Sequence, residues 1–184
     1  MSSEKAEKLN IYKKYYFLED YLFKEISNNF KKNHYLTNEE FFAIIIWKRN
    51  ASKTKILSGI KKSDETVKKI TENLYKEKDR ERKICILTKI DGIGIAIASA
   101  ILTVCYPGEF TIADYRASAS LKSLGYEVKG DPTTKIPVYF DYLDKCKKLT
   151  KKSDLSLRDL DRCLWGYDFY EGKNGLKELA KILK

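Results

Sequence analysis

The chain has 184 residues, which suits one compact domain or two small lobes that share a boundary. Hydrophobic residues make up 43% of the sequence, too many for a disordered chain. Lys and Arg outnumber Asp and Glu by 36 to 26, and the resulting formal charge of +10 suits a polyanionic partner. A lysine-rich surface that is merely solvated would give the same balance, so charge alone leaves the partner open.

The sequence carries neither a membrane signal nor a zinc signal. Its longest apolar run, Ile93 to Tyr106, is too short to cross a bilayer, and the first five residues lead into no apolar signal region. The four cysteines are scattered without a Cys-x-x-Cys pair, and His34 is the only histidine. We therefore expect a cytoplasmic protein with no zinc site and no membrane partner.

The first half of the chain predicts helices. Residues 2–32 fit one long amphipathic helix that could break near Asn28–Asn29. Its expected buried stripe consists of Tyr12, Tyr15, Tyr16, Leu18, Leu22 and Ile26. Thr37 to Glu40 has the form of a capping box before the apolar helix Phe41–Trp47, and a short helix is expected over 51–60. Ser63 then predicts the start of a helix that runs to about Tyr75.

The second half continues this pattern. A dense charge run at 76–83, typical of a solvated helix face, leads into apolar helical segments on both sides of residues 91–94. Phe110–Ile112 is the one strand-like stretch. Further helices are expected from Tyr115 to Gly125, from Pro137 to about Leu149, from Ser156 to Trp165–Tyr167, and over 176–183. The pattern predicts an all-α fold.

The turn Asp91-Gly92-Ile93-Gly94 is the most informative stretch of the sequence. Its glycines allow a sharp turn, and the helix that begins at about Ile95 points unpaired N–H groups outward. That arrangement binds an anion such as a DNA phosphate. Asp91 is unfavourable beside a phosphate unless its side chain turns away to cap the helix.

Asp114 lies twenty residues after Gly94, behind a Pro107-Gly108 turn. The glycine turn, the small-residue helix after it and this spaced aspartate together resemble the helix-hairpin-helix DNA glycosylase superfamily, over roughly Thr88 to Gly125. The resemblance implies a single domain, 1–184, of two helical lobes with a cleft between them. The central lobe would be 35–130 with the hairpin at 84–106, and the second lobe would be 1–34 plus 131–184.

The same resemblance assigns the chemistry. Asp114 would be the catalytic carboxylate, which stabilises an oxocarbenium-like sugar or activates water while the N-glycosidic bond of a flipped base is cut. Bifunctional members, which also cleave the DNA strand, carry a nucleophilic lysine at the position of Ala96, so the resemblance implies a monofunctional enzyme or a relative that has lost catalysis. We expect a monomer, associated with the nucleoid, that binds duplex DNA. The residues expected to contact the DNA are Lys89, Gly92, Ile93, Gly94, Ile95, Ala96 and Arg116.

Three aromatic residues are candidates for the base pocket, namely Trp47, Tyr115 and Trp165, although a core or half-buried packing role explains each as well. By resemblance, the main-chain carbonyls of Thr88, Ile90 and Ile93 would hold Na⁺ or K⁺ against a DNA phosphate. The iron–sulfur cluster of some relatives needs four clustered cysteines near the C-terminus, which this chain lacks.

Simpler interpretations stay open at the sequence level. Asp114 could be no more than the N-cap of the helix Tyr115–Leu124, and Arg116 could form a surface pair with it. The chain could accordingly be a monofunctional DNA glycosylase, a non-enzymatic helix-hairpin-helix DNA-binding protein, or a helical protein–protein adaptor with a basic surface.

Overall fold

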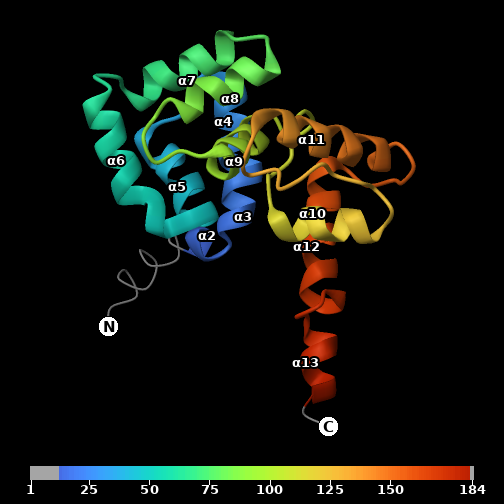
Figure 1. Ribbon diagram of the computed structural model, residues 1–184. Helices are drawn as coiled ribbons and strands as arrows, with labels where there is room; N and C mark the ends of the chain where they lie inside the picture. Colours follow the sequence, from blue (N-terminus) through green and yellow to red (C-terminus); the bar gives the residue numbers. More distant parts are fainter. Residues whose placement is uncertain (1–12, 183–184) are drawn as a thin grey trace, which may run out of the picture.

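The computed structural model describes residues 13–182, with side chains from residue 15 onward, and all regular structure in that range is helical (Figure 1). The N-terminal helices are α2 (Lys13–Tyr16), α3 (Leu18–Asp20), the π-helix η1 (Tyr21–Ile26) and α4 (Ser27–Asn33). The next six are α5 (Asn38–Arg49), η2 (Asn50–Ser52), α6 (Lys53–Lys62), α7 (Val67–Lys76), α8 (Arg80–Thr88) and α9 (Ile95–Cys105). The last four are α10 (Tyr115–Ser123), α11 (Ile136–Thr150), α12 (Leu157–Glu171) and α13 (Leu176–Ile182). The predicted all-α class is confirmed, and no helix of the described chain is apolar over a length that would cross a membrane.

Helix α9 is the centre of the core. All of its residues except Ala96 are buried, because the helix is apolar on every side and other elements must cover it. Helices α4, α5, α8 and η1 pack on it. Helix α10 packs on α12, and α12 continues past α11 and α10 toward α13, which projects away from the rest (Figure 1).

The N-terminal helix differs from the sequence prediction. It breaks at Phe17, whereas Asn28 and Asn29 lie within α4, where Asn28 donates to the Lys24 carbonyl of η1 (2.6 Å) and Asn29 donates to Glu40 on α5 (2.8 Å). Leu22 and Ile26 are buried as predicted. Tyr15 and Tyr16, which precede the break, are exposed, and Leu18, directly after it, is only partly buried. Tyr12 lies outside the described residues.

Three other predictions about the helices and strands are wrong. Ser63 ends α6 by donating its hydroxyl to the Ile60 carbonyl (2.8 Å), and Thr66 caps α7. Helix α12 continues through Gly166 to Glu171, since a single glycine weakens a helix without ending it. Residues 110–112 form no strand, because no second strand within the described chain pairs with them.

The predicted helix starts and stops near the centre of the chain are confirmed. Thr37 and Glu40 form a capping box at α5, and α9 begins at Ile95. Helix α10 gives way to Gly125 at φ +85°, a backbone angle that glycine adopts without strain.

Candidate functional site

The turn between α8 and α9 is held from below by α6. Gly92 has φ +91°, and its Cα faces Lys55 and Ile56. Gly59 lets α6 approach so closely that a Cβ there would lie 2.4 Å from the Asp91 carbonyl oxygen. The Asp91 carboxylate turns away from the start of α9, but it pairs with Lys55 (3.2 Å) and does not cap the helix.

Asp114 is fixed by groups from two helices that flank the segment before it. Ser99 on α9 accepts a hydrogen bond from the Ala113 amide (2.8 Å), and Tyr139 on α11 donates to the Thr111 carbonyl (2.8 Å). The 110–113 segment, which belongs to no helix, thus bonds two of its backbone groups to neighbouring helices. Asp114 then caps α10, and its Oδ1 accepts from the Arg116 amide (2.9 Å).

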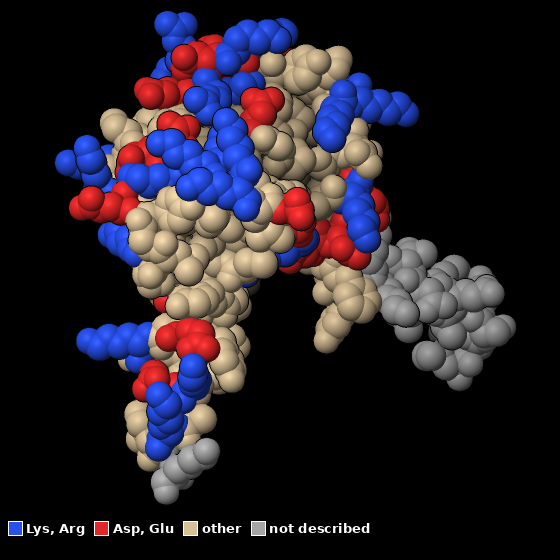
Figure 2. Space-filling model, turned by 90° about the vertical axis from the view of Figure 1, so that its right-hand side faces the viewer, with Lys and Arg blue, Asp and Glu red and all other residues tan. Residues whose placement is uncertain are grey.

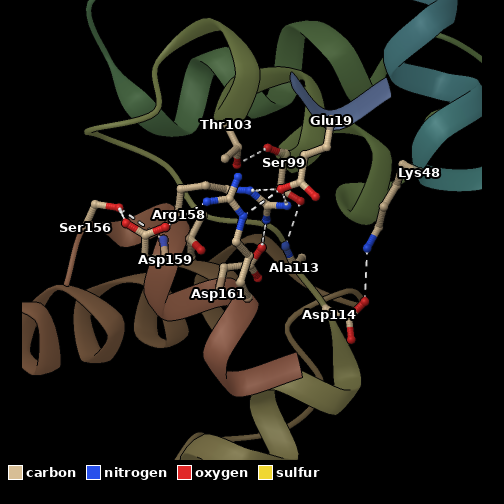
Figure 3. A network of polar contacts seen from close by, with 12 residues as sticks. Glu19, Lys48, Ser99, Thr103, Ala113, Asp114, Ser156, Arg158, Asp159 and Asp161 are labelled. Carbon is tan, nitrogen blue, oxygen red and sulfur yellow. Dashed lines mark hydrogen bonds and ion pairs between the residues drawn. The ribbon is translucent and has the colours of Figure 1, made fainter. Parts of the chain in front are cut away.

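The second carboxylate oxygen of Asp114 has a partner from α5. Lys48 Nζ donates to Asp114 Oδ2 over 3.0 Å, and the two side chains are 18% and 20% exposed. Figure 3 shows the Lys48 side chain pointing from its helix toward this carboxylate. Asp114 is therefore both a helix cap, as the simpler interpretation held, and half of a largely desolvated ion pair.

A pocket of about 380 Å³, the α9 pocket, adjoins this ion pair on the side of the turn. It is lined by Lys48, Arg49, Ser52, Gly92, Gly94, Ile95, Ala96, Ile97, Ala113, Asp114, Tyr115 and Thr133. The first amides of α9, at Ile95 and Ala96, have no carbonyl within the helix to pair with. A Cβ on Gly94 would meet no atom within 4 Å, so the start of α9 is open to a ligand.

A second pocket of about 510 Å³, the α12 pocket, is also lined by the ion pair. It is lined by Glu19, Trp47, Lys48, Ile112, Asp114, Arg158, Asp161, Arg162 and Trp165. The volume exceeds that of a nucleobase, and the lining mixes indole rings with charged groups, as ligand pockets commonly do.

Charged side chains brought together from α3 and α12 form one wall of the α12 pocket (Figure 3). Arg158 pairs with both Glu19 and Asp161, and its guanidinium lies over the rings of Phe23 (4.7 Å) and Trp47 (5.3 Å). Arg162 also donates to Glu19 (2.7 Å). This network fixes the start of α12 against the N-terminal helix.

The two carboxylates of this network differ in their pKa. Burial, only partly offset by Arg158, raises the pKa of Asp161 to about 6. Burial also acts on Glu19, but hydrogen bonds from Arg162 and Arg158 outweigh it and lower the pKa of that carboxyl. The pocket wall thus holds one group that stays ionised and one that gains a proton in mild acid.

The three predicted aromatic residues do not all lie together. Trp47 and Trp165 line the α12 pocket, where Trp165 is 45% exposed and stacks on Phe169 with centroids 5.3 Å apart. Tyr115 lies at the α9 pocket, 61% exposed, and accepts a hydrogen bond from the Arg116 side chain (3.1 Å).

The remaining predicted site residues lie around the turn. Lys89 is exposed just after α8, whereas the Ile93 side chain is buried and its amide donates to the Ile90 carbonyl (3.0 Å). Thr88 is the last residue of α8. Arg116 reaches Asp168 on α12 (3.4 Å), so its ion pair is with that residue and not with Asp114.

Several residues of these pockets carry no signal in the sequence. Lys48 looks like an ordinary cation in the last turn of a helix. Arg158 and Asp161 look like surface charges, and Glu19 is 139 residues away from Arg158. Only packing places them beside Asp114.

Comparison of the chain with protein-family models, with curated proteins and with solved structures found no match.

Proposed function

We propose that this chain is a monofunctional DNA glycosylase that hydrolyses the N-glycosidic bond of a flipped base. In this proposal the segment 84–106 is the helix-hairpin-helix motif, and the two pockets are parts of one cleft between two lobes. The observation that carries the proposal is the position of Asp114, whose carboxylate borders both the pocket at the start of α9 and the pocket with two indoles. A carboxylate so placed can stabilise an oxocarbenium-like sugar.

The surroundings of Asp114 are consistent with DNA binding. The open start of α9 offers amides to a phosphate, and Lys48 and Arg49 add positive charge beside it. The resemblance also places a monovalent cation on the carbonyls of Thr88, Ile90 and Ile93, where it would neutralise a phosphate. The Ile90 oxygen accepts one hydrogen bond and keeps a second lone pair, so it fits such a role.

The test is an excision screen over duplexes that carry different damaged or modified bases, with abasic sites revealed by alkali. Wild-type protein should release at least one base, and Asp114→Asn should lower the rate by on the order of 10²–10³. Asparagine can still cap α10, so the fold and DNA affinity should change little. Full activity in Asp114→Asn would overturn the catalytic assignment.

A non-enzymatic DNA-binding protein is the second candidate. It is favoured because both Asp114 oxygens already have structural partners, the Arg116 amide in the helix cap and Lys48 in the ion pair. It predicts DNA binding without base release from any substrate of the screen. An adaptor function predicts that neither occurs.

A further inference from the structure

Lys48 and Asp114 hold a special place among the described residues, since they alone line both the α9 pocket and the α12 pocket. The ion pair therefore stands at the boundary between the two spaces. Lys48 reaches it from the last turn of α5, and its aliphatic chain is mostly buried.

The proposed function fixes what would cross this boundary. With the DNA backbone at the start of α9 and the flipped base in the α12 pocket, the bond joining sugar to base lies next to the ion pair. Asp114 then faces the sugar carbon at which positive charge develops. The leaving nitrogen of the base, where negative charge develops, lies within reach of the Lys48 ammonium.

We propose that Lys48 is a second catalytic residue, which protonates the leaving nitrogen of an uncharged base, and that uncharged bases are the substrate class of this site. The inference rests on the proposed glycosylase function. As the bond breaks, its electron pair stays on the base nitrogen, which takes a proton from Lys48 Nζ. Water then adds to the sugar cation, and the proton that this water loses returns to the lysine, giving the free base and an abasic sugar.

The α12 pocket is poorly suited to the other main class, bases that alkylation has made cationic. Such bases leave as neutral molecules without a proton donor, and the Lys48 ammonium would repel them. Recognition of a cationic ring also uses the open faces of aromatic side chains. One face of Trp47 already carries a cation, the Arg158 guanidinium at 5.3 Å, and one face of Trp165 stacks on Phe169.

The experiment compares base release by wild-type protein, Lys48→Met and Lys48→Arg on duplexes with uncharged lesions and with N-methylated cationic purines. Methionine keeps the aliphatic packing, and arginine keeps the charge beside Asp114 but does not give up its proton. The matched control is Lys145→Met, which removes the lysine of another partly buried ion pair, with Asp141 at 2.6 Å, away from both pockets.

Both substitutions of Lys48 should slow release of uncharged bases about 10²–10⁴-fold, with the larger losses for the poorer leaving groups, while Lys145→Met matches wild type. Full activity of Lys48→Arg, or equal losses for all leaving groups, would show that Lys48 only positions Asp114. If wild type released cationic bases and no uncharged ones, the proton transfer and the substrate class would both be wrong, while the proposed glycosylase function would remain. No release of any base by wild type would end the proposed function, and this inference with it.

Discussion

At the scale of single residues, neighbouring carboxylates have different roles because their surroundings differ. Asp114 is 20% exposed, caps a helix and pairs with a lysine. Asp161 is 8% exposed and faces Arg158, and its burial raises the pKa to about 6. A carboxyl whose pKa is raised by burial and which lines a pocket is a common feature of functional sites.

The raised pKa of Asp161 predicts how stability depends on pH. The folded state binds this proton more tightly than the unfolded state, whose carboxyl has an ordinary pKa of 3.8. Both states are protonated below about pH 4 and ionised above about pH 6, so folded-state stability falls as pH rises between these limits, by up to about 3 kcal/mol. In urea unfolding, the stability of Asp161→Asn relative to wild type should therefore increase as the pH rises from about 4 to about 6.

Asp141→Asn is the control for this measurement because its sign is opposite. Hydrogen bonds from Lys145 and from the Lys129 amide outweigh partial burial and lower the pKa of Asp141. The stabilisation that the Asp141 carboxylate gives the folded state is present above the pKa of the unfolded state and is lost as the pH falls through the pKa of the folded state. An Asp161→Asn profile parallel to wild type would show that Asp161 stays ionised.

A glycosylase that also cleaves the DNA strand does so through an amine that forms an imine with the sugar. Ala96 cannot form an imine with a sugar aldehyde, and the Lys48 amine is held in its ion pair, so borohydride should trap no adduct between wild-type protein and abasic DNA. Ala96→Lys would place an amine in the α9 pocket beside Asp114 and should give a trapped band on a denaturing gel. Efficient trapping of wild type that Lys48→Arg removes would identify Lys48 as a nucleophile instead.

At the scale of elements, the position of the α8–α9 turn depends on α6. Lys55, Ile56 and Gly59 lie on one face of α6 and contact Asp91 and Gly92. The turn sequence itself supplies only the permissive glycine at positive φ. The open start of α9 is therefore a consequence of packing between segments that lie about thirty residues apart in the sequence.

Two glycines in helix interiors should respond oppositely to alanine. Intrinsic helix propensity favours alanine by up to about 1 kcal/mol at both. At Gly59 the new methyl would collide with the Asp91 backbone, so Gly59→Ala should lower the free energy of unfolding by about 1–3 kcal/mol. At Gly166 the new methyl would meet no atom within 4 Å, so Gly166→Ala should raise the free energy of unfolding by about 0.5–1 kcal/mol. Chemical denaturation of both variants tests this, and a stabilised Gly59→Ala would contradict the close approach.

At the scale of the whole molecule, the formal charge is +10, and on at least one face the cations are mixed with carboxylates. On the face drawn in Figure 2, Lys and Arg side chains are scattered over the upper body with Asp and Glu between them, and further cations line the limb that ends at the C-terminus. A charge of +10 with this distribution favours weak, sequence-independent attraction to a polyanion.

Duplex DNA binding should therefore be sensitive to salt and should depend on the start of α9. Each phosphate that the protein neutralises adds about −0.9 to the slope of log affinity against log salt. Gly94→Leu should weaken binding by filling the α9 pocket, and it should leave the fold intact because the space around Gly94 is open. Gly108→Leu, at an equally open glycine in another turn, is the control. Fluorescence anisotropy measures both, and equal affinities of the two variants would remove the turn from the interface.

The sequence by itself determined what depends on neighbours a few residues apart. The helical class, the capping box at Thr37, the start of α9 at Ile95 and the placement of Asp114 at a helix N-terminus all follow from local patterns, and the structure has them. Local rules failed where two signals competed within one segment. Ser63 and Thr66 are both good caps, and Gly166 could end a helix or merely weaken it.

Only the tertiary structure decided which side chains meet at Asp114. Lys48 lies 66 residues from Asp114, and Glu19 lies 139 residues from Arg158. A cation in the last turn of a helix gains only about 1 kcal/mol or less from the helix dipole or from an exposed carboxylate, so its sequence position does not show which partner it takes. Packing of α5 and the N-terminal helices on the apolar α9 decides the partner. In that packing Lys48 is turned inward to Asp114, whereas Lys89 is left in solvent.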